Sequence, residues 1–342
     1  MTSSVNPEAP GRATLTSLAA ELGLHVSTVS RALSGDPGRV SATTVEAVRR
    51  LAAQRGYRSN LTARALRTGR TSVVGMLVPR LTDEVLATVY EGVDLTSTEA
   101  DYVTLVANTL DDADLREQRI ELLLGRQVDG VILADSLLSS NAAARLEMAG
   151  VPHVLALRCL PTGVNVGTDD LLGGRLAAEH LLSLGHTRLG VLAGEDRAST
   201  GVERTRGFLD ACAEAGVVIP EDAVVPCRFS VTEGAQAAAA LLDAAPDVTA
   251  IFATSDNVAL GAVGTLRERG LSVPEDVSLV GYNNLPMAGS LPVPLTSVDS
   301  RLIEVGRTAM AALLDLLDGG SPASVRLVPE LVVRASTAPP RA

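Results

Sequence analysis

Residues 14–35 read TLTSLAAELGLHVSTVSRALSG, and their pattern predicts the structure of the N-terminal part of the chain. Apolar residues recur in it at helical spacing behind Thr14 or Thr16 as the cap, until Gly23 interrupts the pattern. The segment 27–33 repeats that spacing in a second short helix. Two short helices joined by a glycine-containing turn form a helix-turn-helix, although a solvated helical hairpin would show the same pattern. The apolar positions are Leu15, Leu18, Ala19, Leu22, Val29, Ala32 and Leu33.

The polar residues of the second helix suit DNA. Small hydroxyl side chains and one guanidinium group remain outside its apolar stripe. An arginine can read guanine bidentately, while hydroxyl groups bind phosphates or mixed base edges. We therefore predict that this helix enters the major groove with Ser27, Thr28, Ser30 and Arg31.

A third helix is predicted over residues 41–55, where the apolar residues share one face and Gly56 is a standard helix stop. This helix would close a small core over the first two. The following residues, 57–71, predict a short basic helix that is too polar to be buried. The apolar face of the third helix consists of Val45, Val48, Leu51 and Ala52.

The charge is divided unevenly along the chain. Its 342 residues carry a net charge of −11, and all 29 basic residues are arginines. The absence of lysine excludes the P-loop lysine and the Schiff-base lysine of pyridoxal enzymes. Residues 1–71 hold ten arginines against four acidic residues, a balance of +6, whereas the remainder has a balance of −17. This asymmetry is typical of a small DNA-binding part joined to a body that binds other partners.

In this order, the segments resemble the lac-repressor/galactose-repressor (LacI/GalR) family of transcription regulators. The resemblance rests on residues 14–35, on RVSATTVEAVRRLAAQRGYRSN at 39–60 and on LTARALRTGRT at 61–71, and it continues to the C-terminus. Unlike a lone helix-turn-helix, the combination is highly specific.

The resemblance implies two sets of DNA contacts. In the second helix, Val26, Ser27 and Arg31 would read bases, and Thr28 and Ser30 would bind phosphates. In a hinge helix over residues 60–68, Leu66 would wedge into the minor groove between Arg64 and Arg67, as in proteins that kink DNA; alternatively, Leu66 is a linker residue that packs on the body. His25 stands where the family usually has Ser or another small residue, and it could contact a phosphate or simply be exposed. The implied DNA-binding residues are His25, Val26, Ser27, Thr28, Ser30, Arg31, Asn60, Ala63, Arg64, Leu66 and Arg67.

From residue 72 onward, short Val- and Leu-rich strands alternate with helices, which is typical of parallel sheets. The resemblance implies a periplasmic-binding-protein-like core of two doubly wound parallel-sheet lobes. The expected fold is thus a small all-α helix-turn-helix head plus this α/β core. The expected boundaries are a disordered extension at 1–13, the helix-turn-helix domain at 14–59, a hinge helix and linker at 60–71, a first lobe at about 72–165 and 296–323, a second lobe at about 166–295 and 324–335, and a loose tail at 336–342.

Ligands of such folds bind between the lobes, at the carboxyl ends of the strands, so the residues that follow each predicted strand are the candidates. Arg204 matches the family position that holds the effector, and an ion pair with Glu203 or Asp210 on the helix surface is the alternative. Phe229 stands where relatives present an aromatic side chain, unless it is a core residue, and Asp256 could be only a helix N-cap. The expected effector-binding residues are Arg80, Thr82, Asp83, Arg158, Arg204, Phe229, Ser255, Asp256, Asn283 and Asp299.

These features predict a homodimeric, sequence-specific DNA-binding regulator, in the first place a repressor, that binds a pseudo-palindromic operator in double-stranded DNA. A small-molecule effector such as a carbohydrate would control it from the interlobe cleft. The dimer face is expected on the first-lobe helices at 84–100 and 115–124. The alternative is a solute-binding protein of the same fold, which the basic head disfavours.

Catalysis, cofactors and metals are not expected. None of the four histidines belongs to a Ser/His/Asp arrangement or a metal spacing, and His180 and His186 are expected at the surface or as caps. Cys159, Cys212 and Cys227 are predicted to be small buried residues. No apolar run reaches the ~18 residues of a membrane span, and the polar start lacks the apolar segment of a signal peptide. We therefore expect a cytoplasmic protein without membrane contact.

Overall fold

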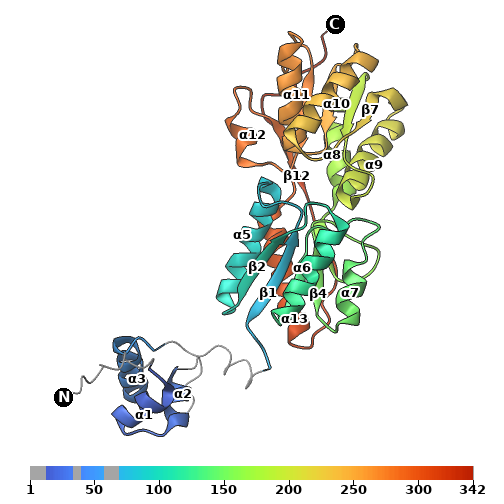
Figure 1. Ribbon diagram of the computed structural model, residues 1–342. Helices are drawn as coiled ribbons and strands as arrows, with labels where there is room; N and C mark the ends of the chain where they lie inside the picture. Colours follow the sequence, from blue (N-terminus) through green and yellow to red (C-terminus); the bar gives the residue numbers. More distant parts are fainter. Residues whose placement is uncertain (1–12, 34–39, 58–68, 342) are drawn as a thin grey trace, which may run out of the picture. The chain divides into compact units, whose positions relative to one another are not determined.

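The computed structural model describes residues 13–33, 40–57 and 69–341. The chain divides into two compact units, Met1–Thr71 and Ser72–Ala342, which are called the head and the body below (Figure 1). Among the described residues, none of the helices combines the length and the apolar character that crossing a bilayer requires.

In its described residues, the head has three short helices around a small apolar core. They are α1 (Leu15–Leu22), α2 (Val26–Leu33) and α3 (Ala42–Gln54). The Thr14 side chain accepts a hydrogen bond from the Ser17 N–H and so caps α1, and Gly23 ends this helix with a φ of 62°. That left-handed conformation favours glycine, which explains why the turn lies there. The predicted helix-turn-helix and third helix are confirmed, and their buried core consists of Leu18, Ala19, Val29, Ala32, Val48 and Ala52.

The first lobe of the body is a parallel sheet with the strand order β11-β5-β4-β3-β1-β2. Helices cover both faces of the sheet, because neighbouring residues of its buried strands point to opposite faces. Met76 of β1 packs with α5 and α13, whereas the next residue, Leu77, packs with α6 and α7. The elements are β1 (Val73–Val78), α5 (Glu84–Glu99), β2 (Val103–Asn108), α6 (Ala113–Gly125), β3 (Gly130–Leu133), α7 (Ala142–Met148), β4 (His153–Ala156), β5 (Asn165–Thr168), α13 (Leu302–Leu317) and β11 (Val325–Leu327).

The second lobe repeats this plan with the strand order β12-β10-β9-β8-β6-β7. Only β12 is antiparallel to its neighbour. Helices α8 and α9 cover one face of the sheet, and α10, α11 and α12 cover the other. Two doubly wound lobes are therefore confirmed. The elements are α8 (Asp170–Ser183), β6 (Leu189–Ala193), α9 (Ser199–Glu214), a 3-10 helix (Glu221–Ala223), β7 (Val224–Pro226), α10 (Val231–Ala244), β8 (Ala250–Ala253), α11 (Asp256–Glu268), β9 (Ser278–Tyr282), α12 (Pro286–Ser290), β10 (Thr296–Asp299) and β12 (Glu330–Val332).

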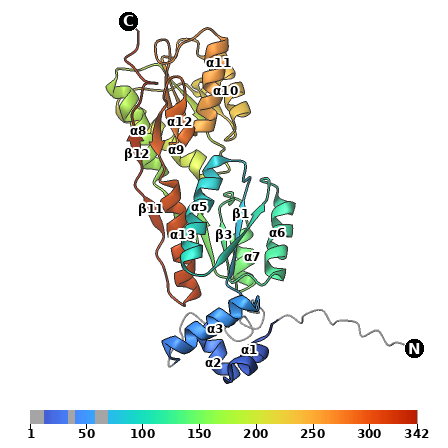
Figure 2. The same ribbon diagram turned by 90° about the vertical axis from the view of Figure 1, so that its left-hand side faces the viewer.

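Glycines let the paired helices of each lobe approach closely. In the first lobe, a Cβ atom added to Gly92 of α5 would lie 2.2 Å from the Ile303 carbonyl oxygen of α13, and these two helices lie side by side in Figure 2. In the second lobe, a Cβ atom on Gly174 of α8 would lie 2.1 Å from the Arg204 carbonyl oxygen of α9. The second approach matters for function, because it fixes the backbone of Arg204 against α8.

The boundaries predicted for the two lobes need correction. Strand β5 belongs to the first sheet, where it pairs with β4, and β10 belongs to the second sheet, where Thr296 pairs with Val280 of β9. The segment assigned to the second lobe at about 324–335 contains two strands, β11 in the first sheet and β12 in the second. The physical reason is that the chain crosses between lobes after β5, β10 and β11, not before them.

The three crossings are bonded to one another. The Thr168 hydroxyl donates to the Ser300 carbonyl oxygen over 2.5 Å, and the Asp169 N–H donates to the Leu327 carbonyl oxygen over 2.9 Å. The Arg326 side chain also donates to the Thr168 carbonyl oxygen over 3.1 Å. The chain therefore passes between the lobes as one hydrogen-bonded group of three segments.

The predicted loose tail is wrong for the described residues 336–341. Ser336 is buried, its hydroxyl donates to the Leu279 carbonyl oxygen, and it accepts a hydrogen bond from the Thr296 N–H. His186, expected at the surface, is also buried, and its Nε2 contacts the Ala338 carbonyl oxygen over 2.8 Å. His180 contacts the Thr337 hydroxyl over 2.9 Å. Side-chain hydrogen bonds, which apolar patterning does not reveal, hold the tail along β9 and α8.

All three cysteines are buried and unpaired, as predicted. Burial raises the pKa of each thiol, that of Cys159 to about 11 and that of Cys227 to about 12. Thiols with raised pKa values are poor nucleophiles, so these residues act as core side chains.

Candidate functional site

In the head, the predicted base-reading residues Val26, Ser27 and Arg31 are exposed on α2. His25 caps this helix: its carbonyl oxygen accepts hydrogen bonds from the Thr28 and Val29 N–H groups. The His25 Nδ1 atom also accepts from the Ser27 N–H over 3.3 Å and lies 2.8 Å from the Ser27 hydroxyl. An imidazole thus replaces the small polar cap, and α2 begins at Val26, one residue before the predicted segment 27–33.

The hinge part of the DNA-binding prediction cannot be placed in the structure. Asn60, Ala63, Arg64, Leu66 and Arg67 lie outside the described residues, so their roles remain predictions from the sequence.

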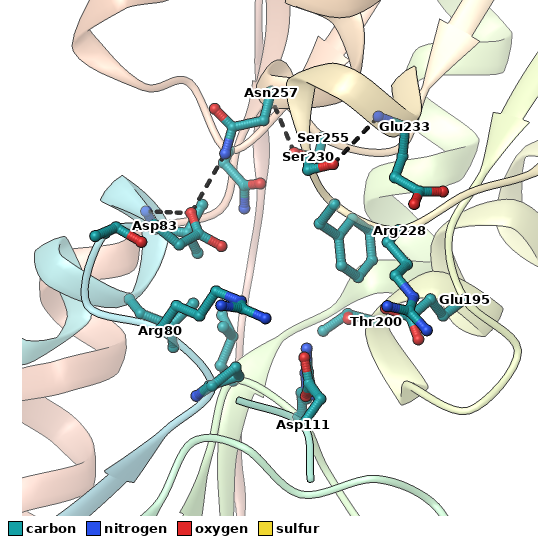
Figure 3. A pocket seen from close by; sticks show the side chains of 18 of the residues that line it. Arg80, Asp83, Asp111, Glu195, Thr200, Arg228, Ser230, Glu233, Ser255 and Asn257 are labelled. Carbon is teal, nitrogen blue, oxygen red and sulfur yellow. Dashed lines mark hydrogen bonds and ion pairs between the residues drawn. The ribbon is translucent and has the colours of Figure 1, made fainter. Parts of the chain in front are cut away.

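In the body, a cavity of about 490 Å³ lies between the two lobes (Figure 3). Its walls consist of residues that follow β1, β2 and β4 in the first lobe and β6, β7, β8 and β9 in the second, as expected for the carboxyl ends of parallel strands. Such a volume suits a small molecule. The predicted effector-binding residues that line the cavity are Arg80, Thr82, Asp83, Arg158, Arg204, Phe229, Ser255 and Asn283.

Arg204 is held by a buried polar cluster. Its Nε donates to the Asp170 carboxylate over 2.8 Å, and its Nη1 donates to the Thr254 carbonyl oxygen over 2.9 Å. The guanidinium carbon lies 3.9 Å from the centre of the Tyr282 ring, whose hydroxyl donates to Asp170 over 2.8 Å. Burial lowers the pKa of Arg204, but the adjacent Asp170 carboxylate and Tyr282 outweigh it and leave the pKa raised. Arg204 is therefore a fixed, permanently charged donor in the cavity wall.

The alternative for Arg204, an ion pair on the helix surface, is excluded by its geometry. Glu203 binds Arg326 instead, and Asp210 binds Arg206. Phe229 lines the cavity beside Arg204, with 5.9 Å between the guanidinium carbon and the ring centre. Its ring is half-buried, so it is not a core residue.

Two polar contacts lie in the cavity wall. Asp83 accepts a hydrogen bond from the Val85 N–H at the start of α5 and another, over 3.3 Å, from the Asn257 side chain of the second lobe. Desolvation raises the pKa of Asp83, although these two donors and Arg158 oppose the shift. Within the first lobe, Arg158 forms an ion pair with Asp111 over 3.0 Å. Asp83 and Asn257 therefore bond the two lobes directly to each other.

Asp256 and Asp299 do not line the cavity. Asp256 is fully buried, accepts from the Ser297 hydroxyl over 2.6 Å and the Leu285 N–H over 2.7 Å, and burial raises its pKa to about 6. Asp299 accepts hydrogen bonds from Asn284 and from the Arg301 N–H. Asp256 follows β8 and Asp299 is the last residue of β10, but both carboxylates connect the loops of the second sheet.

The sequence reasoning missed several polar residues of the cavity wall. Most of them follow a strand directly or stand next to a predicted residue, so the same rule of strand carboxyl ends would have found them. They are Asp111, Glu195, Thr200, Arg228, Ser230, Glu233 and Asn257. Among the described residues, no cluster of His, Cys, Asp or Glu could hold a metal ion.

The chain is similar to known proteins over most of its length. The family profile described as a periplasmic binding protein-like domain matches residues 178–337. The HTH-type transcriptional regulator CelR of Thermobifida fusca is 36% identical over 95% of this chain and 98% of its own. A solved complex of the regulator CelR with cellobiose has a TM-score of 0.73 and 34% identity, and the match covers 95% of this chain and 100% of that one. The crystal structure of a LacI family transcriptional regulator from Mycobacterium smegmatis has a TM-score of 0.72 and 31% identity over 78% of this chain and 100% of its own.

Proposed function

Since the chain belongs to the LacI family of helix-turn-helix transcriptional regulators, we propose that it is a repressor whose operator binding is controlled by a small molecule in the interlobe cavity. The observation that carries the proposal is that both lobes contribute to the cavity, which adjoins a direct interlobe bond from Asp83 to Asn257. A ligand in this position contacts both lobes at once. It therefore binds one lobe arrangement more tightly than another and shifts the population toward it.

We propose that the working form is a homodimer in the cytoplasm that binds a pseudo-palindromic operator. Two-fold symmetry of the protein requires two matching half-sites, one for each head. The first lobe supports a dimer, because it exposes apolar side chains on α5, on the edge strand β2 and on α6. They are Leu95, Val103, Leu105 and Leu122, of which Val103 is 60% exposed.

The arrangement of the two lobes then couples effector binding to DNA binding. One arrangement would hold the two hinge helices together, so that the Leu66 side chains can enter the minor groove, and the other would separate them. The coupling must be reciprocal, so operator DNA changes effector affinity by the same factor by which effector changes DNA affinity. The relative that binds cellobiose supports a hydroxyl-rich effector as the first class to test.

A gel-shift assay of the full chain with the DNA upstream of its own gene tests the proposal. Specific binding should fall steeply with salt concentration, because phosphate contacts release counterions. Arg31→Ala should reduce specific binding, whereas the matched exposed variant Arg126→Ala in the body should not. Absence of specific binding at low salt would refute a DNA-binding function, and stoichiometry on a full operator would distinguish the dimer from other assemblies.

A further inference from the structure

Eight charged side chains line the interlobe cavity, and most of them are already neutralised. Arg158 is paired with Asp111, Arg204 with Asp170, and Glu195 with Arg197. Asp83 accepts two hydrogen bonds from the protein itself. These groups therefore have defined partners without a ligand.

Arg80 and Arg228 are different. Their guanidinium groups make no hydrogen bond and no ion pair within residues 69–341, although the body is rich in carboxylates. Arg126, Arg267 and Arg307 share this property in the body, but these three do not line the cavity. The two unpaired guanidinium groups of the cavity are thus available to a ligand.

The two arginines face the cavity from opposite lobes. Arg80 follows β1 of the first lobe, Arg228 follows β7 of the second, and Figure 3 shows them on opposite sides of the cavity. Closing the lobes on an empty cavity brings two like charges toward each other, which is unfavourable. An anionic group between them reverses the sign of this term and so favours the closed arrangement, which gives the effector a preference for one lobe arrangement.

The rest of the wall indicates what else the ligand carries. On the second-lobe side, the Glu233 carboxylate makes no hydrogen bond and no ion pair with the described part of the chain, and it can accept hydrogen bonds from hydroxyl groups. Ser230 and Thr200 add hydroxyl groups, and the Phe229 ring adds an apolar surface. A compound with several hydroxyl groups and one acidic group matches this distribution.

We propose that the effector is a hydroxyl-rich compound with a phosphate or carboxylate group, which Arg80 and Arg228 bind together. Guanidinium groups are the preferred partners of both anions, because their planar donors match two oxygens at once. This inference rests on the proposed function, since it names the chemical class of the effector for the same cavity.

Thermal unfolding and calorimetric titration of the full chain test the proposal with inorganic phosphate and with three matched sugars. Glucose 6-phosphate and gluconate carry the two candidate anions, and glucose carries none. We expect inorganic phosphate to raise the unfolding temperature, and at least one charged sugar to bind more tightly than glucose. Arg80→Gln and Arg228→Gln should each weaken this binding by about 10- to 100-fold, the factor expected for losing a charge-assisted hydrogen bond.

Arg126→Gln and Arg267→Gln are the matched controls, one exposed and unpaired arginine from each lobe, and they should leave binding unchanged. The proposal is overturned if inorganic phosphate stabilises all four variants equally, which indicates an adventitious ion only, or if it stabilises none, wild type included. It is also overturned if glucose or cellobiose binds the wild type, Arg80→Gln and Arg228→Gln with equal affinity. None of these results affects the proposed DNA binding, which the gel-shift assay measures independently.

Discussion

Substituting Asp170 by alanine should lower the free energy of unfolding more than substituting any exposed residue of the body does. The Asp170 and Arg204 side chains are only 2% and 4% exposed, and the carboxylate accepts hydrogen bonds from both Arg204 and the Tyr282 hydroxyl. Removing one partner of a buried ion pair costs about 3–5 kcal/mol. The orphaned Tyr282 hydroxyl adds about 1–3 kcal/mol, but the two costs arise in one cluster and do not add fully. We expect a total loss of about 4–5 kcal/mol in the free energy of unfolding.

Urea unfolding of the full chain, followed by circular dichroism, measures this loss. The matched control is Arg206→Ala, which breaks an ion pair with Asp210 whose side chains are 70% and 53% exposed, and which should cost less than about 1 kcal/mol. Adding Arg204→Met to Asp170→Ala should restore part of the stability, because the uncompensated buried charge disappears with it. If Asp170→Ala costs no more than the control, or if the double variant is as unstable as the sum of its single variants, the buried-pair reasoning is refuted.

Four further predictions follow from individual residues. Leu66→Ala should weaken binding to the specific operator much more than binding to random DNA in a gel-shift assay, and an equal loss on both would contradict the minor-groove wedge. Asn257→Ala removes the hydrogen bond to Asp83 of the other lobe. It should weaken effector affinity by about 3- to 10-fold in a calorimetric titration. Unchanged affinity would mean that this bond does not favour the ligand-bound arrangement. The pKa of Asp256 is about 6 in the folded chain and 3.8 in the unfolded chain. Protonation of Asp256 therefore contributes about 3 kcal/mol to the free energy of unfolding below pH 4, and this contribution is lost as the pH rises through 6. Asp256→Asn should flatten this part of the curve of stability against pH. Gly174→Ala should cost about 1–3 kcal/mol because its Cβ atom would lie 2.1 Å from the Arg204 carbonyl oxygen, whereas Gly264→Ala in α11, with no atom within 4 Å, should stabilise the chain slightly; equal effects of the two in urea unfolding would contradict the close approach.

The parts of the fold that depend on local sequence were predictable. The head helices were found because their apolar spacing, the Thr14 cap and the Gly23 stop are all local signals. The sheet to which a strand belongs is not a local property. Thr296–Asp299 pairs with β9, and Asn165–Thr168 pairs with β4, so their lobes follow from hydrogen bonds between strands and not from their own composition. The docked tail escaped prediction for the same reason, because its partners lie on β9 and α8.

The candidate site divides in the same way. Residues after strands were predictable as cavity residues, because parallel strands bring their carboxyl ends to one edge. The direction in which each side chain points was not predictable from the sequence. Asp256 follows a strand but turns toward Ser297 and Leu285, and Arg204 was expected from a resemblance whereas its partner Asp170, 34 residues earlier, was not. The contact between α8 and α9 at Gly174 decides that pairing, and no periodic pattern encodes it.

The three bonded crossings between the lobes have a mechanical consequence. A single connecting strand would leave the lobes free to turn about several axes. Hydrogen bonds from Thr168, Asp169 and Arg326 connect the three neighbouring segments to one another. We expect the connected segments to resist twisting and to permit bending about one axis. We therefore expect the cavity to close by bending about one axis, so that ligands of different shape change how far the lobes move rather than the direction in which they move.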